Sequence, residues 1–353
     1  RRRSRELSLR LLLGVRLQAI HGFAAVSVEA AFSRAMELSA EGDPDRDRLL
    51  AHWGLFGCHV VRANLVAAAG LTESLAELAH RLDQGLARVA AGYMLGVTSF
   101  YRGELGAARS ALNEALDLWD TADRDECLLL YGHDLSVGIT AYLGWVLALQ
   151  GDPTAGSAAA RAIELGRDAA DPFSIAYATT FAAQTHLFRD DLAEAKGYAL
   201  ATKAMAFERG YAQWQGQADI QLGHIAERQH RSAGMTAMQQ GLDQYVSTGA
   251  ALALPYTRAF LAEAHTARGE PEQAAAMIRQ GLSETALSGE HYYDAELLRL
   301  DAELSADRGD ALAALETLKH ARVLADTQGA CLLAEKIELV RERIDADNWS
   351  KHE

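Results

Sequence analysis

The chain has 353 residues, of which 49% are apolar, and a formal net charge of −14. The acidic excess argues against a nucleic-acid-binding surface, which needs clustered Lys and Arg, and no apolar stretch approaches the roughly 18 residues of a membrane-spanning helix. With 5 prolines and no convincing two-residue alternation of apolar and polar residues, the composition predicts helices and essentially no β-sheet.

The N-terminal segment follows three arginines with apolar residues at helical spacing, namely Leu9, Leu12, Leu13, Leu17 and Ile20. Arg10 and Arg16 interrupt the apolar run, and no small-residue cleavage site follows closely. The segment therefore predicts a helix rather than a secretory signal. Because the chain does not begin with Met, we expect it to be a piece of a longer protein.

Small residues recur in pairs twelve positions apart, on either side of a short turn. The pairs are Gly96/Ala108, Gly144/Gly156, Ala183/Ala195, Ala262/Ala274 and Ala302/Ala314. Seven anchor positions follow one another at intervals of 40, 48, 39, 40, 39 and 40 residues, namely Phe56, Gly96, Gly144, Ala183, Gly223, Ala262 and Ala302. A period near 40 residues indicates stacked helical hairpins, in which each repeat buries its apolar face against its neighbours.

We therefore predict an all-α fold, a tetratricopeptide-like right-handed α-solenoid of about eight helical hairpins with a C-terminal capping helix. The chain is expected to form a single domain over 1–353. The predicted units span 5–41, 47–82, 84–120, 134–169, 171–208, 212–248, 254–288 and 291–327, and the cap spans 330–347. The turn of the sixth unit lacks glycine, so this unit is expected to be degraded.

The longest interval between anchors contains residues 120–134, which we predict to be an irregular loop of unassigned role. Its carboxylates, Asp123, Asp125 and Glu126, could hold a cation or act as acid and base, although a solvated loop explains them more simply. The chain has no G-x-x-x-x-G-K-[ST], no H-E-x-x-H and no G-x-S-x-G motif. We predict no enzymatic activity, no cofactor and no metal site.

Histidine and cysteine also have structural explanations. Three histidines each follow an anchor by three residues, where we predict packing between units: His59, His186 and His265. The three cysteines are far apart and odd in number, which indicates free thiols in a reducing cytoplasm. We predict small core positions for all three, Cys58, Cys127 and Cys331.

The concave surface of the predicted solenoid is the candidate binding site. Helical spacing from each anchor places ten aromatic, amide or charged side chains toward it: Tyr93, Trp145, Tyr177, Gln184, Gln217, His224, Tyr256, Glu263, Glu296 and Arg299. Aromatic rings with scattered polar groups suit a peptide or an extended partner segment. The alternative for each aromatic residue is packing of helix against helix.

Several segments carry a family resemblance in order along the chain: Gly22-Phe23-Ala24-Ala25, Leu130-Tyr131-Gly132-His133-Asp134, Asp171-Pro172-Phe173-Ser174, Pro255-Tyr256, Leu261-Ala262-Glu263-Ala264, Gly269-Glu270-Pro271-Glu272 and Tyr293-Asp294-Ala295-Glu296-Leu297. Together they resemble the C-terminal helical-repeat region of large bacterial signalling proteins. In those proteins a class III adenylate/guanylate cyclase domain or a DNA-binding domain precedes an AAA/STAND-type ATPase, and the repeats come last. The resemblance covers about residues 5–340 and implies a sensor or scaffold coupled to a nucleotide-driven switch.

Two functions follow as hypotheses. The first is a non-catalytic cytoplasmic interaction module that binds a protein or peptide segment, including its own ATPase domain, in the concave groove. The second is a small-molecule sensor that controls an attached ATPase, cyclase or transcription-regulator switch. Neither hypothesis involves nucleic acid or a membrane.

Overall fold

The computed structural model describes residues 2–39, 45–82, 85–119, 124–231 and 233–350, and all regular secondary structure in these ranges is helical. This confirms the prediction of an all-α fold. The helices are α1 (Arg2–His21), α2 (Val26–Leu38), α3 (Asp45–Val61), α4 (Leu65–Leu82), α5 (Gly85–Tyr101), α6 (Leu105–Trp119), α7 (Arg124–Tyr131), α8 (Leu135–Leu149), α9 (Ala155–Asp168), α10 (Pro172–Phe188), α11 (Leu192–Arg209), α12 (Ala212–Arg228), α13 (Gly234–Ser247), α14 (Leu254–Ala267), α15 (Pro271–Ser288), α16 (Asp294–Asp307), α17 (Ala311–Gln328) and α18 (Cys331–Ser350).

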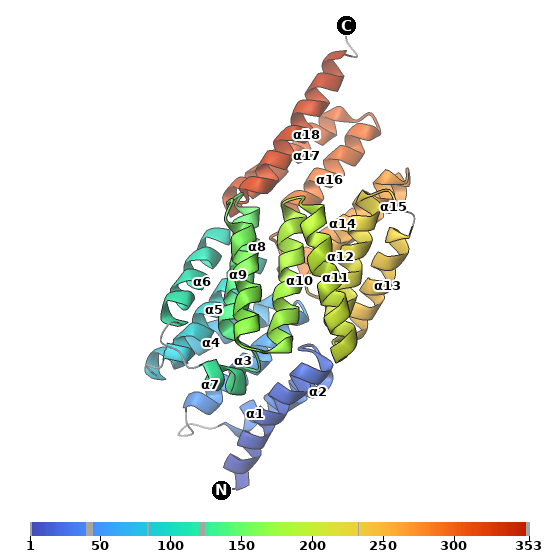
Figure 1. Cartoon of the computed structure of the whole chain (residues 1–353). Helices are drawn as coiled ribbons and strands as arrows, with labels where there is room; N and C mark the ends of the chain where they lie inside the picture. The colour runs from blue at the N-terminus through green and yellow to red at the C-terminus, as the bar shows by residue number, and fades with distance from the viewer. Residues whose placement is uncertain (1, 40–44, 83–84, 120–123, 232, 351–353) are drawn as a thin grey trace.

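Consecutive helices pack as hairpins that follow one another along a superhelix (Figure 1). Each predicted unit contains one such pair, from α1–α2 to α16–α17, and α18 follows them. The pairs begin where local signals specify them. In α10, for example, Asp171 accepts a hydrogen bond from the Ser174 amide (2.8 Å), and Pro172 occupies the first turn, where a missing N–H costs nothing.

The prediction of an irregular loop over 120–134 is wrong for residues 124–131, which form α7. Cys127 and Tyr131 lie four residues apart and are both buried, so this segment is a short amphipathic helix. The ring of Tyr131 packs edge-on against Trp53 of α3, with 5.0 Å between ring centroids. Asp134 then caps α8 by accepting a hydrogen bond from the Ser136 amide. Residues 120–123 lie outside the described residues.

Helices α12 and α13 pack backbone against backbone, in the unit that the sequence predicts to be degraded. A Cβ atom on Gly223 would lie 2.7 Å from the Gly234 carbonyl oxygen, and one on Gly216 would lie 2.7 Å from the Gly241 carbonyl oxygen. Glycines seven residues apart on both helices therefore bring the two backbones into contact. The turn lacks glycine as predicted, but His230 adopts the left-handed conformation (φ 57°) in its place. The unit is intact and tightly packed.

The three histidines after the anchors each contact a polar side chain of their own unit. Each places Nδ1 against the polar side chain five residues later, just before the second helix of its hairpin. These pairs are His59–Asn64 (3.4 Å), His186–Asp191 (3.2 Å) and His265–Glu270 (2.6 Å). The shared contact fixes the turn between the two helices. His186 also lies against the preceding unit, because a Cβ atom on Gly156 of α9 would be 3.5 Å from its Cε1. Packing between units therefore holds for His186 and stays a prediction for His59 and His265.

The cysteines are free, and two of them lie in the core as predicted. Burial raises the pKa of Cys58 to about 12 and raises that of Cys127 as well, so both thiols stay protonated at neutral pH. Cys331 is exposed, and the core prediction is wrong for it. It is the first residue of α18, at the start of the helix, where the chain turns at the surface.

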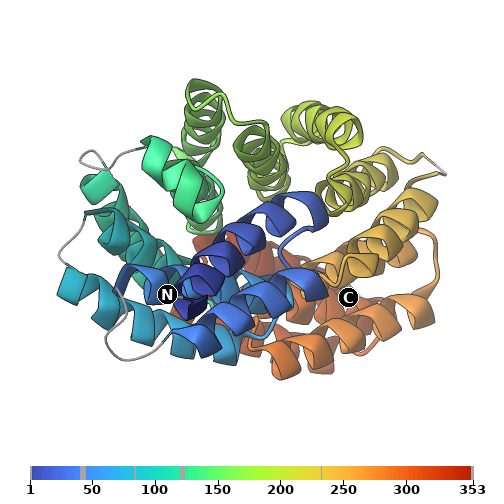
Figure 2. The same cartoon turned by 90° about the horizontal axis from the view of Figure 1, so that it is seen from below.

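The superhelix meets its own earlier turn after about 190 residues. The loop before α14 crosses the C-terminal end of α3, where the amides of 251–252 donate to the Val61 carbonyl (2.8 and 3.0 Å). The loop before α16 repeats this contact, because the amides of 291–292 donate to the Tyr101 carbonyl (2.7 and 3.3 Å) at the end of α5. Seen along the superhelix in Figure 2, the helix pairs run round a ring. We call these two sites the turn contacts.

The turn contacts use backbone groups that helix ends leave free. Val61 and Tyr101 are the last residues of α3 and α5, so their carbonyls have no partner within the helix. On the other side, α14 and α16 each begin eight residues before their anchors, whereas α10 and α12 begin eleven residues before theirs. Helices α14 and α16 therefore begin about one turn later. The residues that would have formed that turn lie in the preceding loops, and their amides donate to Val61 and Tyr101.

Candidate functional site

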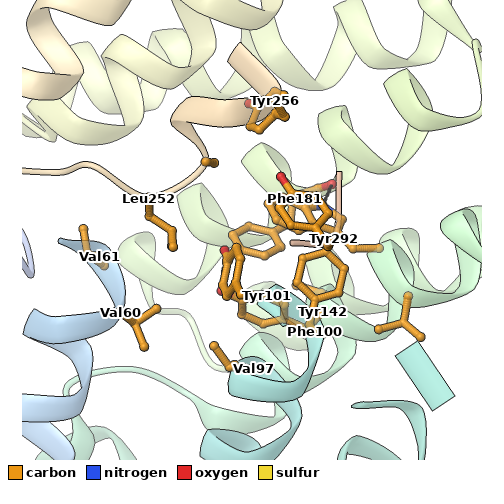
Figure 3. Packing of buried hydrophobic residues seen from close by; sticks show 14 of the residues in the cluster. Val60, Val61, Val97, Phe100, Tyr101, Tyr142, Phe181, Leu252, Tyr256 and Tyr292 are labelled. Carbon is orange, nitrogen blue, oxygen red and sulfur yellow. Dashed lines mark hydrogen bonds between the residues drawn. The ribbon is translucent and has the colours of Figure 1, made fainter. Parts of the chain in front are cut away.

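The inner side of the superhelix is filled with aromatic rings. Phe181 stacks between Trp145 and Tyr177, with ring centroids 4.0 and 4.4 Å away. From the next superhelical turn, Tyr292 packs on Phe100 at 4.7 Å (Figure 3). The concave surface is therefore a packed core over most of its length, and it is not an open groove.

Hydrogen bonds satisfy most polar atoms of this aromatic core. The hydroxyls of Tyr101 and Tyr142 lie 3.0 Å apart, those of Tyr93 and Tyr177 lie 3.1 Å apart, and Trp145 Nε1 donates to the Phe181 carbonyl (2.9 Å). Burial raises the pKa of Tyr101, Tyr142 and Tyr177 well above the ordinary tyrosine value. The core is consequently uncharged.

A cavity remains inside this core, with about 60 Å³ open to water-sized molecules. This volume holds several water molecules, and no charged side chain lines it. Its wall comes from α3, α5, α8, α10, α12 and α13, from the α1–α2 and α7–α8 connections, and from the loop before α14. The lining residues include Phe23, Trp53, Val61, Tyr93, His133, Tyr142, Trp145, Tyr177, Trp214, Gln217 and Leu252.

Two polar atoms of the cavity wall have no hydrogen-bond partner among the described residues, Trp53 Nε1 and His133 Nε2. Both side chains are 3% exposed, and their ring centroids lie 5.7 Å apart. Burial lowers the pKa of His133, and its other ring nitrogen bonds the Tyr131 carbonyl. The neutral ring therefore offers an acceptor at Nε2, beside the indole donor. Leaving such buried groups unpaired costs about 1–3 kcal/mol each.

The structure divides the predicted groove residues into an aromatic group and a charged group. Tyr93, Trp145, Tyr177 and Gln217 line the cavity. The remaining aromatic residue, Tyr256, packs edge-on against Phe260 with 5.0 Å between centroids. Gln184 is fully buried, and its amide makes no hydrogen bond with the described residues. Nine of the ten side chains are buried, and only Glu263 is partly exposed.

The charged group lies on α12, α14 and α16. His224 stacks on Phe260 with 3.7 Å between ring centroids, and its Nε2 lies 3.8 Å from Glu263 Oε2. Arg299 donates two hydrogen bonds to Glu296, each of 2.9 Å, and its Nη2 lies 3.8 Å from Glu263 Oε1. The bidentate Arg299–Glu296 pair is thus the fixed centre of the group, with Glu263 at its open side.

Burial and charge set the protonation of this group. Burial, with the charges of Arg228 and Lys336, lowers the pKa of His224 to about 3. Burial and the neighbouring Glu296 raise the pKa of Glu263 to about 7. Burial would also raise the pKa of Glu296, but the attraction of Arg299 outweighs it and lowers that pKa to about 2. At neutral pH, His224 is therefore neutral and Glu263 is close to its titration midpoint.

Sequence reasoning missed three residues of the interior. Trp53 lies three residues before the anchor Phe56, as Tyr93 does before Gly96, so the repeat position itself could have identified it. His133 belongs to the α7–α8 connection, which has no repeat position. Glu290 is fully buried and accepts the Ala253 amide with both carboxylate oxygens (2.9 and 3.0 Å).

Glu290 therefore caps α14 from a loop 37 residues later in the chain, and burial raises its pKa to about 8. No local pattern marks such a distant cap.

The described part of the chain contains neither a candidate metal site nor a candidate membrane-spanning helix. No group of three His, Cys, Asp or Glu side chains lies close enough there to hold a metal ion. None of the helices in the described ranges has both the length and the apolar character needed to cross a membrane. On α7, Glu126 pairs with Arg46 at 2.6 Å, so this carboxylate of the 120–134 segment has a structural partner.

No protein-family model matches this chain, and no curated protein does. Several solved structures, however, are similar to it in fold. A Rap protein complexed with Competence and Sporulation Factor is 14% identical, with a TM-score of 0.56 over 97% of this chain and 99% of that chain. Aspartyl phosphate phosphatase F from Bacillus subtilis is 14% identical, with a TM-score of 0.50 over 95% and 94%.

The APC/C hetero-tetramer Cut9-Hcn1 is 12% identical, with a TM-score of 0.54 over 92% of this chain and 55% of that chain. At these identities the similarities show the fold, a tetratricopeptide-like α-solenoid, and no specific function.

Proposed function

We propose that this chain is a non-catalytic regulatory repeat module whose interior cavity binds a small uncharged ring compound. The observation that carries the proposal is the pair of unpartnered atoms, Trp53 Nε1 and His133 Nε2, on the wall of an uncharged aromatic cavity. Mostly apolar clefts or cavities with a few convergent polar groups are the usual form of small-molecule sites.

The cavity defines the ligand class. Aromatic walls favour a flat ring, and the absence of charged lining residues disfavours an ion, whose desolvation nothing would offset. The ligand needs one acceptor for the indole N–H and one donor for the imidazole nitrogen, as a phenol or a primary amide provides. The volume limits it to about the size of one amino-acid side chain. Either a free metabolite or one side chain of a short peptide meets this description.

The position of the cavity connects ligand binding to the shape of the superhelix. Val61 and Leu252 line the cavity and also form the turn contact between the end of α3 and the loop before α14. A ligand in the cavity would therefore change how one superhelical turn rests on the next. A protein of similar fold, the Rap protein, is complexed with Competence and Sporulation Factor, which supports ligand binding by such a solenoid. The family resemblance favours a cytoplasmic bacterial signalling protein, with an attached ATPase or cyclase as the controlled domain.

The test is a thermal-shift screen of the chain with neutral ring compounds, such as phenol, indole and benzamide, and with short end-blocked peptides that contain one aromatic residue. A ligand that binds only the folded state raises the melting temperature by mass action. Calorimetry then measures the affinity of each hit. Peptide hits without free-compound hits would identify the peptide source, and the reverse would identify a metabolite.

Trp53→Phe keeps a ring but removes the donor, and we expect about fivefold weaker binding for the loss of about 1 kcal/mol. His133→Phe should have a similar effect. Trp119→Phe, at the end of α6 and outside the cavity, is the matched control and should leave the affinity unchanged. Hits that bind all three variants equally well, or no hit in the panel, would refute the proposal.

A second candidate function rests on Glu263, which is the partly exposed member of the charged group and makes no hydrogen bond shorter than 3.5 Å with the described residues. A protein segment that carries a basic side chain could bind there, on the inner side of α14. Crosslinking of the chain to its partner, or to the rest of its own protein, should then be lost in Glu263→Gln. Unchanged crosslinking would exclude this site.

A further inference from the structure

The first helix is apolar on two opposite sides. Residues that point inward from α1, Leu7, Leu11 and Val15, are 2–7% exposed and join the core. A second set points the other way and is 44–67% exposed: Leu9, Leu12, Leu13 and Ile20. Successive residues of a helix are about 100° apart, so the second set forms one stripe on the opposite side. We call this stripe the outer face of α1.

The outer face differs from the other helix surfaces in the described ranges. Exposed large apolar side chains elsewhere occur singly or in twos on a helix, as with Leu200 and Phe207 of α11. Scattered exposed side chains of this kind are ordinary, whereas a contiguous exposed apolar stripe marks an interaction site. Figure 1 places α1 at one end of the superhelix, beside α2, and no described residue buries this stripe.

The charge of α1 is opposite to that of the rest of the chain. The helix contains five arginines and one glutamate, a net charge of +4. Because the whole chain carries −14, all other residues together carry −18. Its one acidic residue, Glu6, is already paired with Arg34 at 3.1 Å. Arg5 and Arg16 are exposed on the same stripe as the leucines and form no ion pair with the described residues. The outer face therefore offers apolar contacts flanked by unpaired positive charge.

We propose that the outer face of α1 docks an amphipathic helix of a partner protein, whose apolar stripe is flanked by Asp and Glu. Leu9 to Ile20 spans about 16 Å, or three helical turns, which matches the anchor spacing of a helix bound along a groove or face. Acidic flanks would pair with Arg5 and Arg16. The proposal is independent of the interior cavity, because none of these residues lines it.

Charge separates this partner from the two alternatives. A second copy of the chain would bring another helix of charge +4 to the same face, and like charges would oppose the contact. An anionic membrane would attract α1, but it would repel the rest of the chain, which carries −18. An acidic helix is also repelled by the remaining −18, but it is short and contacts only α1, whose charge is +4.

The experiment uses two labelled synthetic peptides with identical leucine positions at helical spacing, one flanked by Glu and one by Lys. Fluorescence anisotropy with the full chain should show binding of the Glu peptide at least tenfold tighter than the Lys peptide, and weaker binding as salt rises. Two further measurements test the alternatives. Sedimentation with vesicles that contain anionic phospholipid tests membrane binding, and analytical ultracentrifugation of the chain alone tests dimerisation.

Leu9→Gln with Leu13→Gln should weaken binding of the Glu peptide at least tenfold, and Arg5→Glu with Arg16→Glu should reverse the peptide preference. All four positions are exposed, so folding is retained and is checked by circular dichroism. Leu200→Gln with Phe207→Gln is the control on another helix and should change nothing. Equal binding of both peptides, insensitivity to the α1 variants, dimerisation through α1, or sedimentation with the vesicles would each overturn the proposal.

Discussion

Replacing Glu290 with Gln should remove a pH dependence from the stability of this protein. The carboxylate is fully buried, and burial raises its pKa to about 8 from an ordinary value of 4.5, although the hydrogen bonds from the Ala253 amide act in the opposite direction. Between these values the folded protein keeps a proton that the unfolded chain has released. The free energy of unfolding therefore falls as pH rises through this interval and is highest, for this group, below pH 4.5.

The size of the effect follows from the two pKa values. An interval of about 3.5 units, at about 1.4 kcal/mol per unit, corresponds to a loss of about 5 kcal/mol for full titration of Glu290. This is an upper value, because local opening of the loop would hydrate the carboxylate. A glutamine carbonyl still accepts the Ala253 amide and cannot ionise, so Glu290→Gln should retain the cap and lose this slope.

The assay is urea unfolding, followed by far-UV circular dichroism, at pH values from about 5 to 8. Other groups that titrate in this window, such as Glu263, are common to both proteins and cancel in the difference. Glu272→Gln is the matched control, because the Glu272 side chain is 80% exposed and pairs with Arg308 on the surface. Parallel stability curves for the wild type and Glu290→Gln would refute the argument that Glu290 is buried with a raised pKa.

Three further predictions concern packing, closure and thiol access. Gly223→Ala should destabilise the protein by about 1–3 kcal/mol in urea unfolding, because the added methyl meets the α13 backbone, whereas Gly197→Ala, with open space around it, should stabilise by about 0.5–1 kcal/mol. The amides of Leu252 and His291 should exchange with deuterium as slowly as helix-interior amides although they lie in loops, and rapid exchange would show that the turn contacts are open in solution. Cys331 alone should react with a thiol reagent in the native state, and the labelling of more than one cysteine would contradict the burial of the other two.

The sequence predicted the helices well because each hairpin is specified locally. The small residues at Gly96 and at the other anchors, the cap at Asp171 and the glycine-containing turns all act within about 40 residues. The same locality explains why most predicted units coincide with one helix pair. The prediction failed at α7, where two buried residues four positions apart are too short a signal to separate a helix from a loop.

The closure of the superhelix could not be predicted in the same way. It depends on small rotations that accumulate over five units, and on hydrogen bonds between residues about 190 positions apart, such as Leu252 and Val61. The donors are backbone amides, which carry no side-chain signature. The ten predicted groove residues were chosen on the assumption of an open concave surface. Closure converts most of them into core residues and leaves a small cavity in place of the groove.

The closed interior holds both stabilising and destabilising groups, so a ligand or a change of pH can alter the balance between them. The turn contacts and the stacked rings favour closure. Trp53 Nε1, His133 Nε2 and the Tyr292 hydroxyl, which have no hydrogen-bond partner in the part of the chain that the structure describes, oppose it, as does the buried Glu290. A ligand can shift a conformational equilibrium only by its difference in affinity for the two states. A neutral ring compound that pairs with Trp53 and His133 would favour the closed state, and ionisation of Glu290 at high pH would favour the open one. Ligand affinity should therefore fall as pH rises from about 7 to 9, and Glu290→Gln should abolish that fall.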